Sequence, residues 1–228
     1  MDAKQDSLRN PLGLDEACPN CPALVERRER VIHGYGDVGA DVLVVGEAPT
    51  AGAEGTAVPF TGDETGRGVH ALLADLGLSS SLPTADHPEV ENVYLTYLAR
   101  CRHPDRPPSD GEIATCDPFL NAEVRMINPE ILLPVGERAL EVLAAEHTTL
   151  GTPPDIGDAH ATEIRGRGFL LVPMRDPADQ TDAEEQALRE TMASLLGGDY
   201  RQSKGRRGQQ ERKERSRREM GSDTGTDR

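Results

Sequence analysis

Four short apolar segments alternate along the chain with segments of helical periodicity, and this alternation restricts the possible folds more than any other feature. The apolar segments lie at residues 41–46, 93–98, 131–135 and 169–172. Short continuous apolar runs are typical of strands that are buried on both faces, as in parallel sheets. Parallel neighbours need right-handed helical crossovers. The sequence therefore predicts an α/β fold with three layers, α/β/α, around a central four-stranded, mainly parallel sheet.

The helical segments carry their own start and stop signals. Apolar residues from Val69 to Leu76 recur at i, i+3, i+4 and i+7, and Gly77 stops this stripe. Ser109–Glu112 and Thr181–Glu184 have the pattern of capping boxes and predict two further helix starts. Between the first strand and the first stripe, a Gly-, Pro- and Ala-rich segment is expected to be a loop. Because ligands of open parallel sheets bind at the carboxyl ends of the strands, we expect the site in the loops that follow them.

Charge is distributed unevenly along the chain. The net charge is −15, from 25 Lys and Arg against 40 Asp and Glu. Residues 201–228 hold ten of these bases, five of the acids and almost no apolar side chain. We therefore predict a globular domain over residues 1–200 and a disordered basic tail over residues 201–228. The tail is either a nucleic-acid-binding arm or a solvated extension without a partner.

The composition of residues 1–200 favours a halophilic protein. This acidic body contains a single lysine, Lys4, and no tryptophan. Surface carboxylates keep a protein hydrated in concentrated salt, which screens their mutual repulsion. Taken by itself, such acidity argues against a nucleic-acid partner. No apolar run reaches 18 residues and no targeting pattern opens the chain, so we expect a cytoplasmic protein without a membrane span.

Four cysteines form two pairs in the sequence. Cys18 and Cys21 are a C-x2-C pair, and Cys101 and Cys116 flank a proline-rich loop. In a cytosolic protein, four cysteines favour a metal site over disulfides. Structural zinc and a [4Fe–4S] cluster both accept four thiolates, and the spacing does not choose between them. Unliganded buried thiols are the remaining alternative.

A set of motifs in a characteristic order gives the chain a family resemblance. The motifs are Gly46-Glu47-Ala48-Pro49, Val58-Pro59-Phe60-Thr61-Gly62, Arg100-Cys101-Arg102 and Val135-Gly136-Glu137-Arg138-Ala139. Together with the four cysteines, this order resembles the family 4 uracil-DNA glycosylases, which carry an iron–sulfur cluster. The resemblance covers residues 18–196 and implies the fold of a uracil-DNA glycosylase.

The resemblance implies hydrolysis of the N-glycosidic bond of uracil, or of a related deaminated base, flipped out of DNA. Gly46, Ala48 and Pro49 would face the sugar and the base. Phe60 would stack on the base, and Glu47 would orient water or stabilise an oxocarbenium-like sugar. The resemblance also implies that the four cysteines, with the N-terminal segment, hold a [4Fe–4S] cluster rather than zinc. We expect a monomer that acts on single- or double-stranded DNA.

Thr50 replaces a family glycine, and two further departures from the family pattern bear on the chemistry. Tyr97 stands where the family has an Asn that reads the uracil edge, and a phenol cannot reproduce the paired donor and acceptor of an amide. Asp176 stands where the family has a His that donates to the departing base. As a catalytic group, only a protonated Asp176 could donate; the neighbouring Arg175, a permanent cation, is an alternative. We predict that Tyr97 and Arg175 contact the base or the DNA.

These features lead to three hypotheses. The first is a DNA glycosylase of base excision repair, and the second is a catalytically impaired iron–sulfur DNA-binding protein of the same fold. The third, a small-molecule enzyme, lacks support because there is no Walker A motif and no Gly-rich dinucleotide fingerprint between a strand and a helix. Concentrated salt weakens counterion release, so we expect stacking, shape and local arginines such as Arg100 and Arg102 to hold DNA.

Overall fold

The computed structural model describes residue 5 and residues 7–198. The chain divides into two compact units, residues 1–191 and residues 192–228. The first unit contains the sheet, and the described part of the second is the end of the last helix, up to residue 198. The predicted basic tail, residues 201–228, lies outside the described residues.

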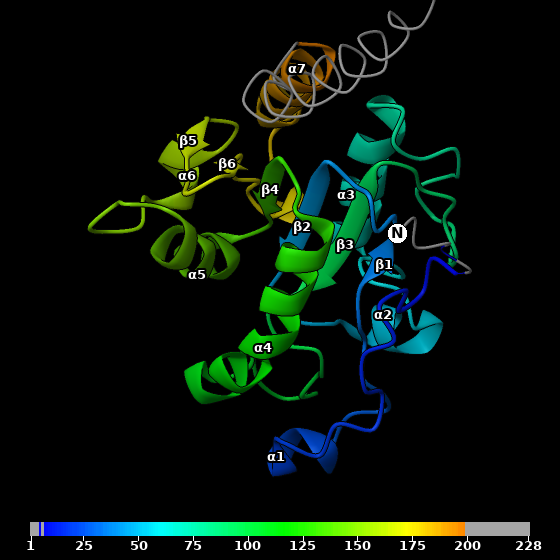
Figure 1. Ribbon diagram of the computed structural model, residues 1–228. Helices are drawn as coiled ribbons and strands as arrows, with labels where there is room; N and C mark the ends of the chain where they lie inside the picture. The colour runs from blue at the N-terminus through cyan, green and yellow to red at the C-terminus, as the bar shows by residue number, and fades with distance from the viewer. Residues whose placement is uncertain (1–4, 6, 199–228) are drawn as a thin grey trace, which may run out of the picture. The chain divides into compact units, whose positions relative to one another are not determined.

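A mixed sheet of six strands forms the centre of the first unit (Figure 1). The strands are β1 (Tyr35–Gly36), β2 (Val42–Gly46), β3 (Val93–Tyr97), β4 (Ile131–Pro134), β5 (Ile164–Arg165) and β6 (Leu170–Leu171), in the order β1-β3-β2-β4-β6-β5. The four inner strands are parallel, whereas β1 and β5 pair antiparallel at the edges. The predicted parallel core is confirmed, but the sheet has six strands rather than four. The edge strands are two residues long, too short to give a periodic pattern.

The helices begin mostly where the sequence places their caps. They are α1 (Pro22–Val25), α2 (Ala51–Thr56), α3 (Glu64–Asp75), α4 (Asp110–Ile127), α5 (Glu137–His147), α6 (Ile156–Ala159), the 3-10 helix η1 (Pro177–Asp179) and α7 (Asp182–Gly197). Ser109 and Glu112 form a complete capping box at the start of α4, as predicted. The segment expected to be a loop after β2 contains α2 instead, because the Thr50 hydroxyl caps it by accepting a hydrogen bond from the Ala53 N–H. Among the described residues, every helix is too short or too polar to cross a membrane.

Different helices cover the two faces of the sheet. Leu43, Val45 and Leu132 point to one face, where they pack with buried side chains of α4 and α5. Val42 and Val44 alternate to the opposite face. In Figure 1, α4 crosses in front of β2 and β3, and α3 lies behind them. These are the three layers that the sequence predicts.

The parallel register brings three strand ends to one edge of the sheet. Gly46 of β2 pairs with Tyr97 of β3, and Val45 pairs with Pro134 of β4. Each of these residues is at or beside the last position of its strand. The segments that follow β2, β3 and β4 therefore leave the sheet side by side, which is where open α/β sheets bind ligands.

Candidate active site

A pocket of about 740 Å³ lies at the carboxyl ends of β2, β3 and β4. Its two main walls are residues 46–51, which include the last residue of β2 and the segment after it, and part of the loop that joins β3 to α4. We call the first, together with Phe60 and Tyr97, the β2 wall, and the second, defined as residues 101–112, the loop wall. The residues predicted for the site that line the pocket are Gly46, Glu47, Ala48, Pro49, Phe60, Tyr97 and Asp176. Seven predicted residues thus meet in one pocket, as expected for a ligand site at the carboxyl ends of parallel strands.

Phe60 and Tyr97 form the aromatic part of the pocket. Their ring centroids lie 4.9 Å apart, with 33° between the ring planes. The backbone N–H of Phe60, a residue in the left-handed conformation with φ 58°, donates to the Tyr97 hydroxyl at 2.7 Å. A Cβ at Gly46 would lie 2.8 Å from Phe60 Cζ, so only glycine allows this packing. Tyr97, which is 3% exposed, therefore supports Phe60 and leaves the pocket open.

Glu47 is the acidic group at the end of β2. Its carbonyl accepts a hydrogen bond from the Ala99 N–H at 2.9 Å, which fixes the backbone beside β3. Partial burial raises the pKa of the Glu47 carboxyl, and the positive charge of Arg138 opposes that rise. A carboxylate with a raised pKa in a pocket is a stronger base than one in water.

Asp176 lines the pocket from the start of η1. Its Oδ1 accepts hydrogen bonds from Thr65 Oγ1 at 2.6 Å and from the Ala178 N–H at 3.0 Å. Both contacts require an accepting oxygen, so Asp176 joins α3 to η1 as an acceptor.

Arg175 is not brought to the pocket. Its guanidinium pairs with Glu184 of α7 at 2.9 Å, and its backbone N–H donates to His160 Nδ1 at 3.0 Å. It is absent from the pocket lining, among the residues that the structure describes. Arg175 therefore contacts α7, whereas its neighbour Asp176 lines the pocket. Their adjacency in the sequence does not predict this difference.

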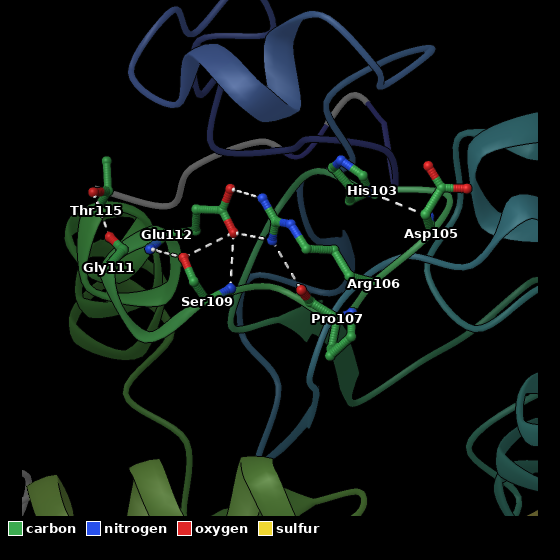
Figure 2. A network of polar contacts seen from close by, with 8 residues as sticks. All are labelled: His103, Asp105, Arg106, Pro107, Ser109, Gly111, Glu112 and Thr115. Atoms are coloured by element: carbon green, nitrogen blue, oxygen red, sulfur yellow. Dashed lines mark hydrogen bonds and ion pairs between the residues drawn. The ribbon is translucent and has the colours of Figure 1, made fainter.

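The loop wall is held by an ion pair and a helix cap (Figure 2). Arg106 donates to both carboxylate oxygens of Glu112, at 2.7 and 2.8 Å. Glu112 also accepts from the backbone N–H of Ser109 at 2.8 Å and from its hydroxyl at 3.0 Å. The Arg106 hydrogen bond, helped by those from Ser109, lowers the pKa of Glu112 to about 2. The loop is therefore clamped to the first turn of α4.

His103 is a pocket residue that the sequence reasoning missed. It is partly buried, lines the pocket from the loop wall, and accepts the Asp105 N–H on Nδ1 at 3.2 Å. The only signal for it in the sequence is its place in the loop after a predicted strand end.

The cations near the pocket are paired with carboxylates. Arg102 pairs with the buried Glu54 at 3.4 Å, and Arg138 pairs with Glu141 at 2.8 Å and also with Asp110. These contacts place positive charge beside Glu47 while neutralising most of it locally. The predicted role of Arg102 in holding DNA stays a prediction.

Arg100 cannot contact DNA, so the expectation that it does is wrong. Its side chain is 1% exposed and pairs with Glu123 of α4 at 2.6 Å. Glu123 also accepts from the Thr96 hydroxyl at 2.7 Å and from the Tyr94 hydroxyl at 3.3 Å. This network joins the end of β3 to α4 beneath the loop wall.

The four cysteines lie around one apolar cluster beside that loop. Cys18, Cys101 and Cys116 are buried and Cys21 is partly buried. Leu24, Val31 and Phe119 pack against them. Arg28 donates to Cys101 Sγ at 3.0 Å and to the Cys18 carbonyl at 2.7 Å, joining the N-terminal segment to the loop. Burial raises the pKa of Cys101 to about 11, against the lowering effect of Arg28.

The thiols interact with one another. Burial raises the pKa of the Cys21 thiol, and charges on Cys116 and Cys18 raise it further. Within residue 5 and residues 7–198, however, no group of three or more His, Cys, Asp or Glu side chains is arranged to hold a metal ion. The fit to an iron–sulfur cluster therefore rests on the donor chemistry, four thiols in apolar surroundings with a cation on one sulfur.

Comparison with known proteins assigns the chain that forms this pocket to a family. The profile described as the Uracil DNA glycosylase superfamily matches residues 33–196. Type-5 uracil-DNA glycosylases are similar, including those of Mycobacterium tuberculosis (32% identical over 191 residues, 73% of this chain and 71% of the relative) and Thermus thermophilus (37% over 151 residues, 57% and 68%). A type-4 uracil-DNA glycosylase of Thermotoga maritima is 32% identical over 124 residues, 54% of this chain and 58% of the relative.

The matched region contains the pocket and two of the four cysteines. Relatives of both types occur, so the resemblance to family 4 is secure at the level of the superfamily and not at the level of the type. The profile covers well over half of the chain. The chain belongs to the uracil-DNA glycosylase superfamily.

Proposed function

We propose that this protein is a DNA-repair glycosylase that hydrolyses the N-glycosidic bond of uracil, or of a related deaminated base, in DNA. The observation that carries the proposal is the convergence of Glu47 and Phe60 on one pocket at the carboxyl ends of parallel strands. Membership of the superfamily and relatives that are named uracil-DNA glycosylases support the reaction class.

The pocket suits a base that has left the DNA stack. Unstacking costs a few kcal/mol, which stacking and edge contacts in a protein pocket offset. Phe60 supplies an aromatic ring, and the absence of a side chain at Gly46 lets the end of β2 approach that ring. The flipped nucleotide would lie between the β2 wall and the loop wall.

Glu47 is the group we assign to the chemistry. Its carboxylate would orient the attacking water, accept a proton from it, and stabilise positive charge on the sugar as the base departs. Because burial raises its pKa, the carboxylate is protonated at a higher pH than an ordinary Glu with a pKa of 4.5. Base release should therefore decline on the acid side at a pH above 4.5.

We propose that Cys18, Cys21, Cys101 and Cys116 hold a [4Fe–4S] cluster, with zinc as the alternative. When bound, the cluster would supply metal–thiolate links between the N-terminal segment and the loop wall, and a redox-active centre outside the pocket. Iron and acid-labile sulfide in equal amounts, with visible absorption after anaerobic purification, would support it. A colourless protein with stoichiometric zinc would contradict it.

A catalytically impaired DNA-binding protein is the second candidate. It is favoured by Asp176, whose contacts make it an acceptor, and by Tyr97, whose hydroxyl is engaged by the Phe60 N–H. We also propose that this protein is a monomer that acts on DNA in concentrated salt. Both candidates predict DNA retention at molar KCl, and only the glycosylase predicts base release.

A base-release assay separates the two candidates. The substrates are single- and double-stranded oligonucleotides with uracil, hypoxanthine or xanthine, at low salt and at molar KCl. We expect release by the wild type, and a rate lower by roughly 10²–10⁴-fold for Glu47→Gln. The matched control is Glu91→Gln, at an exposed position outside the pocket. No release of any base by cluster-loaded wild type would contradict the glycosylase.

A further inference from the structure

The pocket needs a hydrogen-bond donor for the departing base. When the bond between the sugar C1′ and the base nitrogen breaks, the electron pair stays on the base, and negative charge develops on its carbonyl oxygens. A donor aimed at such an oxygen accelerates this kind of step by roughly 10²–10³-fold. Asp176 is poorly suited to this role, since a carboxylate has no hydrogen to donate and its Oδ1 already accepts hydrogen bonds from the Thr65 hydroxyl and the Ala178 N–H.

The arginines of the pocket are occupied with carboxylates. Arg106 makes a two-pronged pair with Glu112, and Arg102 pairs with the buried Glu54. Arg138 pairs with Glu141 and Asp110. Turning any of these guanidinium groups toward a base would leave a carboxylate without its partner.

His103 carries a donor of a different kind. Its Nδ1 accepts the Asp105 N–H at 3.2 Å, so the neutral ring carries its hydrogen on Nε2. No described residue accepts a hydrogen bond from Nε2. The residue is partly buried and lines the same pocket as Glu47 and Phe60. A fixed tautomer with a free N–H in a pocket is the chemistry that the departing base requires.

The loop that carries His103 is anchored on both sides. Arg106 and Ser109 clamp its far end to Glu112 of α4, as Figure 2 shows. On its near side, Arg28 donates to Cys101 Sγ. Donors that are held in place before the reaction cost no reorganisation when charge develops.

We propose that His103 is a further catalytic residue, whose Nε2–H donates a hydrogen bond to the base as it leaves. The inference rests on the proposed function. In the balanced step, the C1′–N bond breaks, its electron pair goes to the base, and water forms the new C1′–O bond. Glu47 takes one proton from that water. His103 stabilises the base anion without transferring its own proton, and the anion is later protonated by solvent.

The test compares two leaving bases in single-turnover base release. His103→Ala should slow the release of uracil by roughly 100-fold at saturating enzyme. It should slow the release of 5-fluorouracil much less, because fluorine withdraws electrons and the anion needs less help. DNA affinity, measured by fluorescence anisotropy, should change little. A residue that only shapes the loop would slow both bases by the same factor.

Three variants serve as controls. His103→Gln retains an amide N–H and should recover part of the rate. His87→Ala removes a histidine at an exposed position outside the pocket and should leave both rates unchanged. Tyr97→Phe tests the Tyr97 hydroxyl as the donor instead, and a greater loss for uracil than for 5-fluorouracil in that variant alone would overturn the assignment to His103. Melting curves establish that each variant is folded.

The two proposals fail in different ways. If the cluster-loaded wild type releases no base, the glycosylase proposal fails, and the role of His103 fails with it. If the wild type is active and folded His103→Ala releases uracil at the same rate, or loses the same factor for both bases, the inference about His103 alone is overturned.

Discussion

The β2 wall of the pocket differs from the loop wall in the interactions that hold it. In the β2 wall, a glycine lets Phe60 approach the strand, and Tyr97 fixes Phe60 through ring packing and one backbone hydrogen bond. In the loop wall, the pair between Arg106 and Glu112 fixes the chain, and Cys101 lies at its start. One wall is built from packing and the other from charges.

The difference has consequences for chemistry. Packing and buried hydrogen bonds respond little to salt, whereas exposed ion pairs are screened. The β2 wall carries Glu47 and Phe60, which the motifs predict. The loop wall carries His103, the donor we infer. We therefore expect substitutions to separate binding of the base from assistance to its departure.

The largest effect is expected at the buried pair beneath the loop wall. Arg100 and Glu123 are 1% and 0% exposed and lie 2.6 Å apart. Glu123→Gln removes the negative charge and leaves the Arg100 cation unpaired in the interior. Breaking one partner of a buried pair costs about 3–5 kcal/mol, and urea unfolding monitored by circular dichroism measures it.

A double variant sharpens this prediction. Arg100→Met with Glu123→Leu removes both charges, so it should be more stable than Glu123→Gln alone. The pair also joins β3 to α4 beneath the loop wall, so base release should fall in the single variant even under conditions where it remains folded. A loss of stability well under 1 kcal/mol in Glu123→Gln would show that Arg100 finds another partner.

An intermediate effect is expected in the β2 wall. Tyr97→Phe keeps the ring but removes the hydroxyl that accepts the Phe60 N–H, and a buried N–H without a partner costs about 1–3 kcal/mol. Tyr35→Phe is the matched control, because this buried hydroxyl donates to the Pro88 carbonyl away from the pocket. Both variants should lose stability in denaturant unfolding. Only Tyr97→Phe should weaken binding of the substrate, and equal binding in both would contradict its role in holding Phe60.

Much of the fold could be predicted because each buried strand is a short run of apolar residues that can be recognised in the sequence. The segments at 41–46, 93–98 and 131–135 became β2, β3 and β4, and each is fully buried within its strand bounds. The edge strands β1 and β5 could not be predicted, since two residues give no periodicity. α2 was missed because its glycines resemble a loop, while its cap, Thr50, acts through one side-chain hydrogen bond.

The site residues likewise differ in whether a local sequence pattern marks them. Glu47 and Phe60 could be predicted because they lie in contiguous motifs at a strand end. His103 could not, because its importance depends on pairings across 6 to 48 residues that commit Arg106 to Glu112 and Arg102 to Glu54. Arg100 was misread for the same reason, since its partner Glu123 is 23 residues away on α4. The role of a charged side chain thus depends on the partner that it contacts in the folded protein.

The smallest effect is expected at Glu112, and it depends on pH and salt. The pKa of Glu112 is lowered from 4.5 to about 2, chiefly by Arg106, so its carboxylate stabilises the folded state fully above pH 4.5 and progressively less as the pH falls toward 2. Because the Arg106 side chain is 38% exposed, water screens the pair, and Glu112→Gln should lower the melting temperature at pH 7 by only about 1–3 °C. The difference between wild type and variant should shrink at molar KCl and again between pH 4.5 and 2, in scanning calorimetry at each condition. A difference independent of both would mean that Glu112 acts through its cap on Ser109 alone, and that the loop wall, like the β2 wall, is held by uncharged contacts.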